Sequence, residues 1–200
     1  MGPKTNYRAT FITTEAVEVS SASSFTITWN ISGGTNLDRI GGEGNFFGVV
    51  NNGDSNNWYD NKGIGIMIDG GNRTSDWSVV EVDTGFRNAT GYALGNSRPA
   101  ASELQDGFSL SLTWHSDNTY AVSTTGLNNN DTSTGTFGDR VTYDQLTSSL
   151  FAYGELAGGG SPTIGMTVAS VELTVFAIPE PSTTALLGLG GLALIQRRRR

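Results

Sequence analysis

Polar and apolar residues alternate along most of this chain with a period of two. The alternation is clearest in residues 24–31, 63–69 and 107–114. Because successive side chains of a strand point to opposite sides, this pattern predicts strands with one buried face. Residues 143–149, preceded by Thr142 as a cap, predict a short helix. Further strands, rich in Val, Ile, Thr and aromatic residues, are predicted at 7–19, 45–50, 77–82, 119–123, 150–154 and 163–176.

Segments rich in Gly, Asn and Asp separate the predicted strands, at 32–36, 51–54, 69–72, 117–118, 128–131 and 158–160. These residues tolerate the positive φ angles of tight turns. Many short strands joined by such turns predict an all-β fold, a β-sandwich or jelly roll. The length of residues 1–178 suits a single domain with its own core.

Three of these segments, 46–50, 63–69 and 108–127, resemble the strands and hairpin of concanavalin A-like and laminin-G-like sandwiches. The resemblance is one of pattern and not of a catalytic motif. It implies that residues 1–178 form a concanavalin A-like β-sandwich ectodomain.

The final segment, 179–200, differs in composition from the rest of the chain. It begins with Pro179, Glu180 and Pro181 and ends with Arg197, Arg198, Arg199 and Arg200. The prolines fix φ and remove backbone donors, so this part is expected to be extended. An uncharged apolar stretch follows, with Ala185, Leu186, Leu187, Leu189, Leu192, Leu194 and Ile195. As a helix it would span roughly 22 Å, short of a hydrocarbon core of roughly 30 Å, so we predict a short transmembrane helix with cationic flanks.

The four arginines predict the orientation of this helix, because cations beside an apolar helix stay on the cytoplasmic side. The order of Pro-Glu-Pro, apolar helix and arginines resembles the PEP-CTERM sorting signal of Gram-negative bacteria. That resemblance implies anchoring in the inner membrane, processing by an exosortase near Pro179–Pro181, and delivery to the cell surface or the extracellular polysaccharide. The alternative, a buried or amphipathic C-terminal helix, is disfavoured because the stretch is apolar all round.

Composition narrows the partners of the body. The net charge is −7 although four of the twelve cations lie at the C-terminus, so the body is more acidic still and nucleic acid is not an expected partner. The absence of cysteine excludes disulfides, thiolate metal sites and a cysteine nucleophile. Residues 1–6 show no apolar signal-peptide segment, although the resembled proteins carry one. We expect either that the true start lies upstream or that the signal was removed.

Catalysis has one carboxylate candidate, Glu81 with Asp83, since acids alternating on one strand face are typical of jelly-roll glycoside hydrolases. A retaining mechanism needs two carboxylates about 5–5.5 Å apart. The next position on the same face is Gly85, so the third acid of that pattern is missing. His115 is the single histidine and no Gly-x-Ser-x-Gly elbow accompanies it. We therefore predict no catalytic residues, with Glu81 and Asp83 on the solvent face of an ordinary strand.

Two candidate binding sites lie in the loop that follows residue 51. Asn52, Asp54, Asn56 and Asp60 supply the oxygen atoms that Ca²⁺ prefers, although local Asx-turns are the alternative. Trp58 and Tyr59 offer flat faces for a sugar ring, with core or rim packing as the alternative. We predict an exported, non-catalytic structural or glycan-interacting sandwich; a glycoside hydrolase and a protein-binding adhesin are the alternatives.

Overall fold

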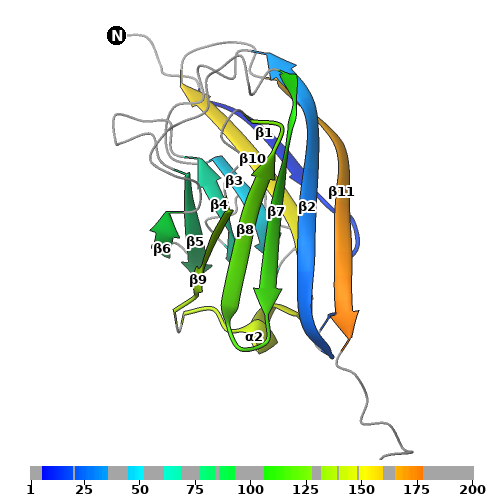
Figure 1. Ribbon diagram of the computed structural model, residues 1–200. Coiled ribbons are helices and arrows are strands. Elements are labelled where there is room, and N and C mark those ends of the chain that lie inside the picture. Colours follow the sequence, from blue (N-terminus) through cyan, green and yellow to red (C-terminus); the bar gives the residue numbers. More distant parts are fainter. Residues whose placement is uncertain are drawn as a thin grey trace, which may run out of the picture.

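Two antiparallel β-sheets pack face to face in the computed structural model of this protein (Figure 1). The structure describes residues 6–19, 21–35, 45–51, 61–68, 77–83, 86–92, 106–127, 132–138, 140–147, 149–159 and 165–177, and the account is confined to these.

The first sheet has six strands in the order β1-β10-β3-β4-β5-β6. Their bounds are β1 Asn6–Ile12, β3 Asn45–Val50, β4 Lys62–Ile68, β5 Trp77–Asp83, β6 Phe86–Tyr92 and β10 Phe151–Gly159. The second sheet has five strands in the order β11-β2-β7-β8-β9. Their bounds are β2 Ala22–Thr35, β7 Phe108–His115, β8 Thr119–Thr125, β9 Thr132–Thr136 and β11 Gly165–Ala177.

The main core lies between the two sheets, and β7 shows how the sequence builds it. Its buried residues alternate with half-buried polar ones along the whole strand. The buried face of β7 consists of Phe108, Leu110, Leu112 and Trp114. Trp114 packs edge-on against Phe25 and Phe137, with ring centroids 6.1 Å and 5.5 Å apart. The period-two prediction is confirmed for this strand and for β2.

Most of the described side chains of β3, β4 and β5, in the middle of the six-stranded sheet, are buried on both faces, which the sequence-based prediction missed. A second apolar cluster lies on the face turned away from the main core, formed by Phe46, Val50, Met67, Val80, Val82 and Tyr153. The prediction of a half-buried strand at 63–69 was wrong, because Ile64, Met67 and the residues between them are all buried. Glycines make room for this cluster: a Cβ on Gly65 would lie 2.6 Å from Cζ of Phe46.

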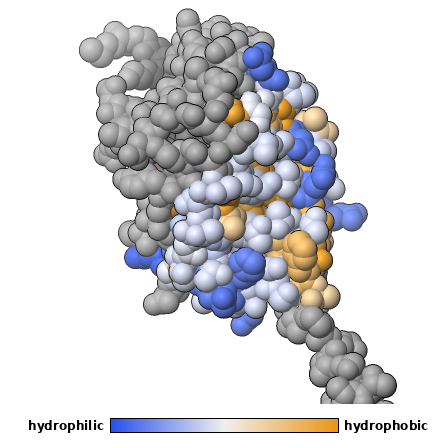
Figure 2. All heavy atoms as spheres, in the orientation of Figure 1, coloured by the Kyte–Doolittle hydropathy of each residue, from blue (hydrophilic) through white to orange (hydrophobic). Residues whose placement is uncertain are grey.

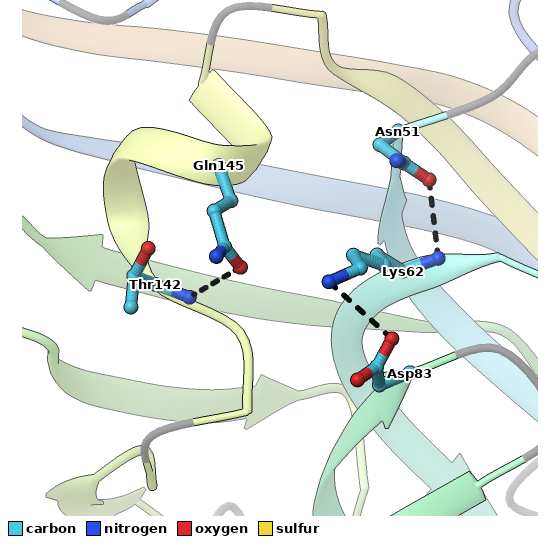
Figure 3. A network of polar contacts seen from close by, with 5 residues as sticks. All are labelled: Asn51, Lys62, Asp83, Thr142 and Gln145. Atoms are coloured by element: carbon cyan, nitrogen blue, oxygen red, sulfur yellow. Dashed lines mark hydrogen bonds and ion pairs between the residues drawn. The ribbon is translucent and has the colours of Figure 1, made fainter.

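The helix predicted at 143–149 is confirmed as α2, Tyr143–Thr147, which is two residues shorter at its end and is preceded by Thr142 as the expected cap. The Thr142 backbone N–H donates to Oε1 of Gln145 at 3.4 Å, and the Gln145 N–H donates to the Thr142 carbonyl at 3.1 Å (Figure 3). The first of these bonds is one half of a capping box, in which the side chain of the third helical residue accepts from the N–H of the cap residue, and the second is a backbone bond of the first turn. Strands β6 and β9 were not predicted from the sequence.

In the part of the chain that the structure describes, no helix is both long and apolar enough to cross a bilayer. The expected membrane segment at 185–195 lies outside the described residues.

Candidate functional site

Most residues predicted to bind or to be processed lie outside the described part of the chain. This holds for the Pro-Glu-Pro motif, the apolar helix and the arginines in 178–200, and for the loop residues Asn52, Asp54, Asn56, Trp58, Tyr59 and Asp60. The structure does place Glu81, Asp83 and His115. It also forms a polar hollow that the sequence did not indicate.

Glu81 does not lie on a solvent face, and this part of the prediction was wrong. It stands opposite Ile64 in the sheet register, so its side chain points toward the main core, and it is fully buried. Its Oε2 accepts a hydrogen bond from the Gly138 backbone N–H at 2.8 Å. A buried carboxylate needs such donors because removing an ion from water costs on the order of several kcal/mol. Glu81 therefore joins β5 to the segment after β9, and its burial keeps a polymeric sugar away from it.

Asp83 lies two residues further along β5, at the rim of the sandwich. Its Oδ1 lies 3.4 Å from Nζ of Lys62, and both side chains are about one-third exposed, 31% and 36% (Figure 3). The Lys62 backbone N–H donates to Oδ1 of Asn51 at 3.1 Å. An exposed ion pair of this kind contributes about 0–1 kcal/mol. The two carboxylates thus differ in environment, since Glu81 is fully buried and Asp83 is paired with Lys62 at the surface.

Among the described residues, no three His, Asp or Glu side chains gather in a way that could hold a metal ion. The predicted calcium ligands at 52–60 lie outside the described residues.

His115 ends β7 beside the turn to β8, half-buried as a turn-adjacent residue. The neighbouring Asp117 accepts hydrogen bonds from the Thr119 hydroxyl at 2.6 Å and the Thr119 backbone N–H at 3.0 Å. These two bonds, with a smaller contribution from His115, lower the pKa of Asp117 below its ordinary value of 3.8. This is an Asx-turn that holds the hairpin closed, and it explains the local polar cluster without catalysis.

The outward face of the five-stranded sheet is lined by small polar side chains. The view in Figure 2 shows a mostly pale, weakly polar surface over β7 and β8. Three cross-strand pairs are hydrogen-bonded through their side chains: Thr26–Thr113 at 2.7 Å, Thr28–Ser111 at 2.8 Å and Asn30–Ser109 at 2.7 Å. The ladder fixes the hydroxyl groups in place, so the face presents ordered polar atoms with few charges.

An open hollow of about 490 Å³ lies at one end of this face. It is lined by Asn30, Ile31, Ser32, Asp106, Gly107, Phe108, Ser109, Thr125, Gly126 and Ala169. Two glycines in the left-handed region shape it, Gly107 with φ 97° and Gly126 with φ 86°. A Cβ on Gly107 would lie 2.8 Å from the Ile31 carbonyl oxygen, so only glycine fits there.

The amide of Asn30 is the most strongly held polar group in the hollow. Its Nδ2 donates to Oγ of Ser170 and to Oε1 of Glu172, each at 2.8 Å, and its Oδ1 accepts from Oγ of Ser109 at 2.7 Å. Both amide hydrogens are thus used, while the carbonyl oxygen retains a second lone pair. The hollow therefore offers a preoriented acceptor beside hydroxyl groups, an arrangement suited to a neutral, hydroxyl-rich ligand.

The sequence carried no local signal for this hollow. Asn30 occupies one polar position in an alternating strand, and its partners Ser109 and Ser170 are 79 and 140 residues away. The sheet order alone brings them together, because β2 lies between β11 and β7.

The sandwich is similar to solved lectin domains. It matches the legume lectin-like domain from Entamoeba histolytica with a TM-score of 0.57 and 16% identity, over 86% of this chain and 81% of that one. It matches the exoplasmic/lumenal domain of VIP36, in a Ca²⁺/Man-bound form, with a TM-score of 0.60 and 11% identity, over 88% of this chain and 76% of that one. It matches the potassium-bound carbohydrate recognition domain of Emp46p with a TM-score of 0.52 and 16% identity, over 88% of this chain and 82% of that one. The fold is therefore a legume-lectin-like, concanavalin A-like β-sandwich, as the resemblance implied.

The C-terminal residues 177–200 match the PEP-CTERM protein-sorting motif. No curated protein matches the chain by sequence. The motif implies export, anchoring in the membrane before processing, and processing by an exosortase. The chain thus combines a lectin-like sandwich with a sorting signal.

Proposed function

We propose that this protein is an exported, non-catalytic carbohydrate-binding sandwich that acts at the cell surface or in the extracellular polysaccharide. The observation that carries the proposal is the polar hollow, where the Asn30 amide is held by three hydrogen bonds on a fold that resembles lectin domains. Its volume, about 490 Å³, lies within the usual range for small-molecule sites, roughly 300–1,000 Å³.

The loop at 52–60 is the second part of the proposal. Trp58 and Tyr59 supply aromatic faces on which sugar rings pack, whereas Phe108, the aromatic residue in the lining of the hollow, is buried. Ca²⁺ is proposed to bind Asn52, Asp54, Asn56 and Asp60, because a hard cation prefers carboxylate and amide oxygens. The Ca²⁺/Man-bound form of VIP36 supports testing metal and sugar together.

A glycan array with the fragment 1–178, which contains every strand of both sheets, tests the proposal. We expect specific glycan binding that falls at least tenfold in Asn30→Ala or in Trp58→Ala, depending on which place holds the sugar. Thr26→Ala is the matched control, since Thr26 lies on the same strand face outside the hollow. Binding to no glycan, with or without Ca²⁺, would overturn the proposal.

The metal is tested without relying on glycan binding. At a Ca²⁺ concentration 100 times the dissociation constant, a site of the folded state alone adds about 2.7 kcal/mol of stability. We expect Ca²⁺ to raise the Tm of the fragment and Asp54→Asn to abolish the rise, whereas the exposed Asp144→Asn should leave it unchanged. An equal Tm with Ca²⁺ and with a chelator would refute calcium binding.

A further inference from the structure

The end of β11 breaks the polar pattern of the outward face. Along that face of the strand, Ser170, Glu172 and Thr174 are followed by Phe176, which is 48% exposed. Its neighbour Val175 points to the other side of the strand and is 45% exposed. Within the described part of the chain, the exposed large apolar side chains are Phe11, Val17, Val175 and Phe176. Two of these four are therefore consecutive, and the strand end is apolar on both sides.

This apolar strand end is held by the sheet. Val175 stands opposite Phe25, and Phe176 stands opposite Ser24, in the register of β11 with β2. The Ser23 hydroxyl also donates a hydrogen bond to the Phe176 carbonyl at 2.9 Å. The backbone of Val175 and Phe176 is thus held in the sheet, while their side chains remain about half exposed.

The position of the patch in the chain indicates what covers it. Residues 178–184 are the only link between Ala177 and the apolar stretch that starts at Ala185. Seven residues span at most about 25 Å when fully extended. While that stretch is in a bilayer, the end of β11 therefore stays close to the lipid surface. Figure 2 shows an apolar patch on the lower right of the molecule, where β11 ends in Figure 1.

We propose that Val175 and Phe176 dock onto the bilayer surface while the chain is anchored. This inference rests on the anchoring step implied by the sorting motif, not on glycan binding. A tether of this length gives the patch a high effective concentration at the membrane, so a weak apolar contact is enough. Glu172 is the single ionisable residue of β11, so an anionic surface repels the strand little.

The contact has a consequence for processing. It holds the body in one orientation, with Pro179–Pro181 at the membrane surface where a membrane enzyme can reach them. After cleavage the tether is lost, and two apolar side chains no longer suffice to retain the body, since even a single longer acyl chain binds membranes only marginally.

The absence of cysteine allows a direct test with the full chain. Ala177→Cys and, as a control, Thr132→Cys at the opposite edge of the same sheet are labelled with an environment-sensitive fluorophore. The labelled chains are placed in phosphatidylcholine–phosphatidylglycerol vesicles whose acyl chains carry bromine as a quencher. We expect at least threefold stronger quenching at position 177 than at position 132.

A second pair of variants separates docking from mere proximity. In the Ala177→Cys background, Val175→Ser with Phe176→Ser should reduce the quenching to the level at position 132. Phe11→Ser, which removes an exposed apolar side chain from the other sheet, should leave it unchanged. Quenching unaffected by the double substitution, or seen only when an exosortase is added, would overturn bilayer docking.

Flotation of the same vesicles distinguishes a failure of docking from a failure of membrane anchoring. Chains that float without quenching at 177 would refute docking and leave anchoring intact. Chains that do not float would refute the anchoring step and docking with it. The glycan array is independent of both results.

Discussion

Asn118 connects the turn between β7 and β8 to the aromatic core, and its replacement should cost several hydrogen bonds at once. Its backbone is in the left-handed region, with φ 70°. Its Oδ1 accepts a hydrogen bond from Nε1 of the fully buried Trp114 at 3.0 Å, and its Nδ2 donates to the Gly138 carbonyl at 3.0 Å. The Gly138 N–H in turn donates to Glu81 of β5. Asn118 therefore links the turn between β7 and β8 to the segment after β9, which is itself bonded to β5.

The magnitude follows from these contacts. Asn118→Gly keeps the backbone conformation but leaves the buried Trp114 N–H without its acceptor, which costs about 1–3 kcal/mol, and loses a further bond of about 0.5–1.5 kcal/mol. The expected loss is therefore about 2–4 kcal/mol. Asn118→Ala adds the left-handed cost of about 1–2 kcal/mol, partly offset by the greater freedom of an unfolded glycine, about 0.4–1 kcal/mol.

Urea unfolding of the fragment 1–178, followed by tryptophan fluorescence, measures both variants. We expect the order wild type, Asn118→Gly, Asn118→Ala in decreasing stability. In a separate thermal unfolding experiment we expect the Tm to fall by about 4–16 °C for Asn118→Gly. Ser116→Ala is the control, because its exposed side chain lies in the same turn and should change stability by less than about 0.5 kcal/mol. An Asn118→Gly variant within about 0.5 kcal/mol of wild type would show that these hydrogen bonds do not hold the core.

Two further predictions concern the turn and the six-stranded sheet. Thr119→Val should raise the pKa of Asp117 toward 3.8 in a carboxyl NMR titration, since the Thr119 hydroxyl is the main cause of its lowering; an unchanged pKa would contradict this. Because the folded-state pKa is lowered, the stabilisation by Asp117 is present above pH 3.8 and is lost as pH falls through the folded-state pKa. Gly65→Ala should destabilise by about 1–3 kcal/mol or more, as its Cβ would lie 2.5 Å from the Phe47 carbonyl oxygen. Gly154→Ala, whose nearest contact is 3.3 Å to a ring edge, should cost clearly less, and equal losses in urea unfolding would refute the steric argument.

The strands that could be predicted best from the sequence are those with one buried and one solvent-facing side. In β7, each polar position of the sequence is a half-buried position of the structure, and the predicted range 107–114 differs from Phe108–His115 by one residue at each end. Strands β6 and β9 escaped prediction because they contain few large apolar residues: β9 reads Thr-Ser-Thr-Gly-Thr. Their pairing with β5 and β8 is decided by the neighbouring strand and not by their own sequence.

Glu81 shows why the candidate site could not be read from the sequence. Its alternation with Val80 and Val82 is the same for a solvent-facing and a core-facing carboxylate. A consecutive apolar pair, Val79–Val80, is the local sign that both faces of β5 are buried, since such runs are typical of strands covered on both sides. Gly138, 57 residues away in the chain, supplies a donor that helps to make burial of the carboxylate tolerable.

The sequence by itself determined the sorting signal, because Pro-Glu-Pro, an apolar stretch and four arginines act through their order along the chain. It also determined the all-β class, because a period of two is a local property of strands. The tertiary structure alone decided that Asn30 meets Ser109 and Ser170 and that Glu81 meets Gly138, and it alone left Phe176 exposed at the end of β11. These contacts join strands far apart in the chain, so sheet order and register set them, and neither is encoded in any single segment.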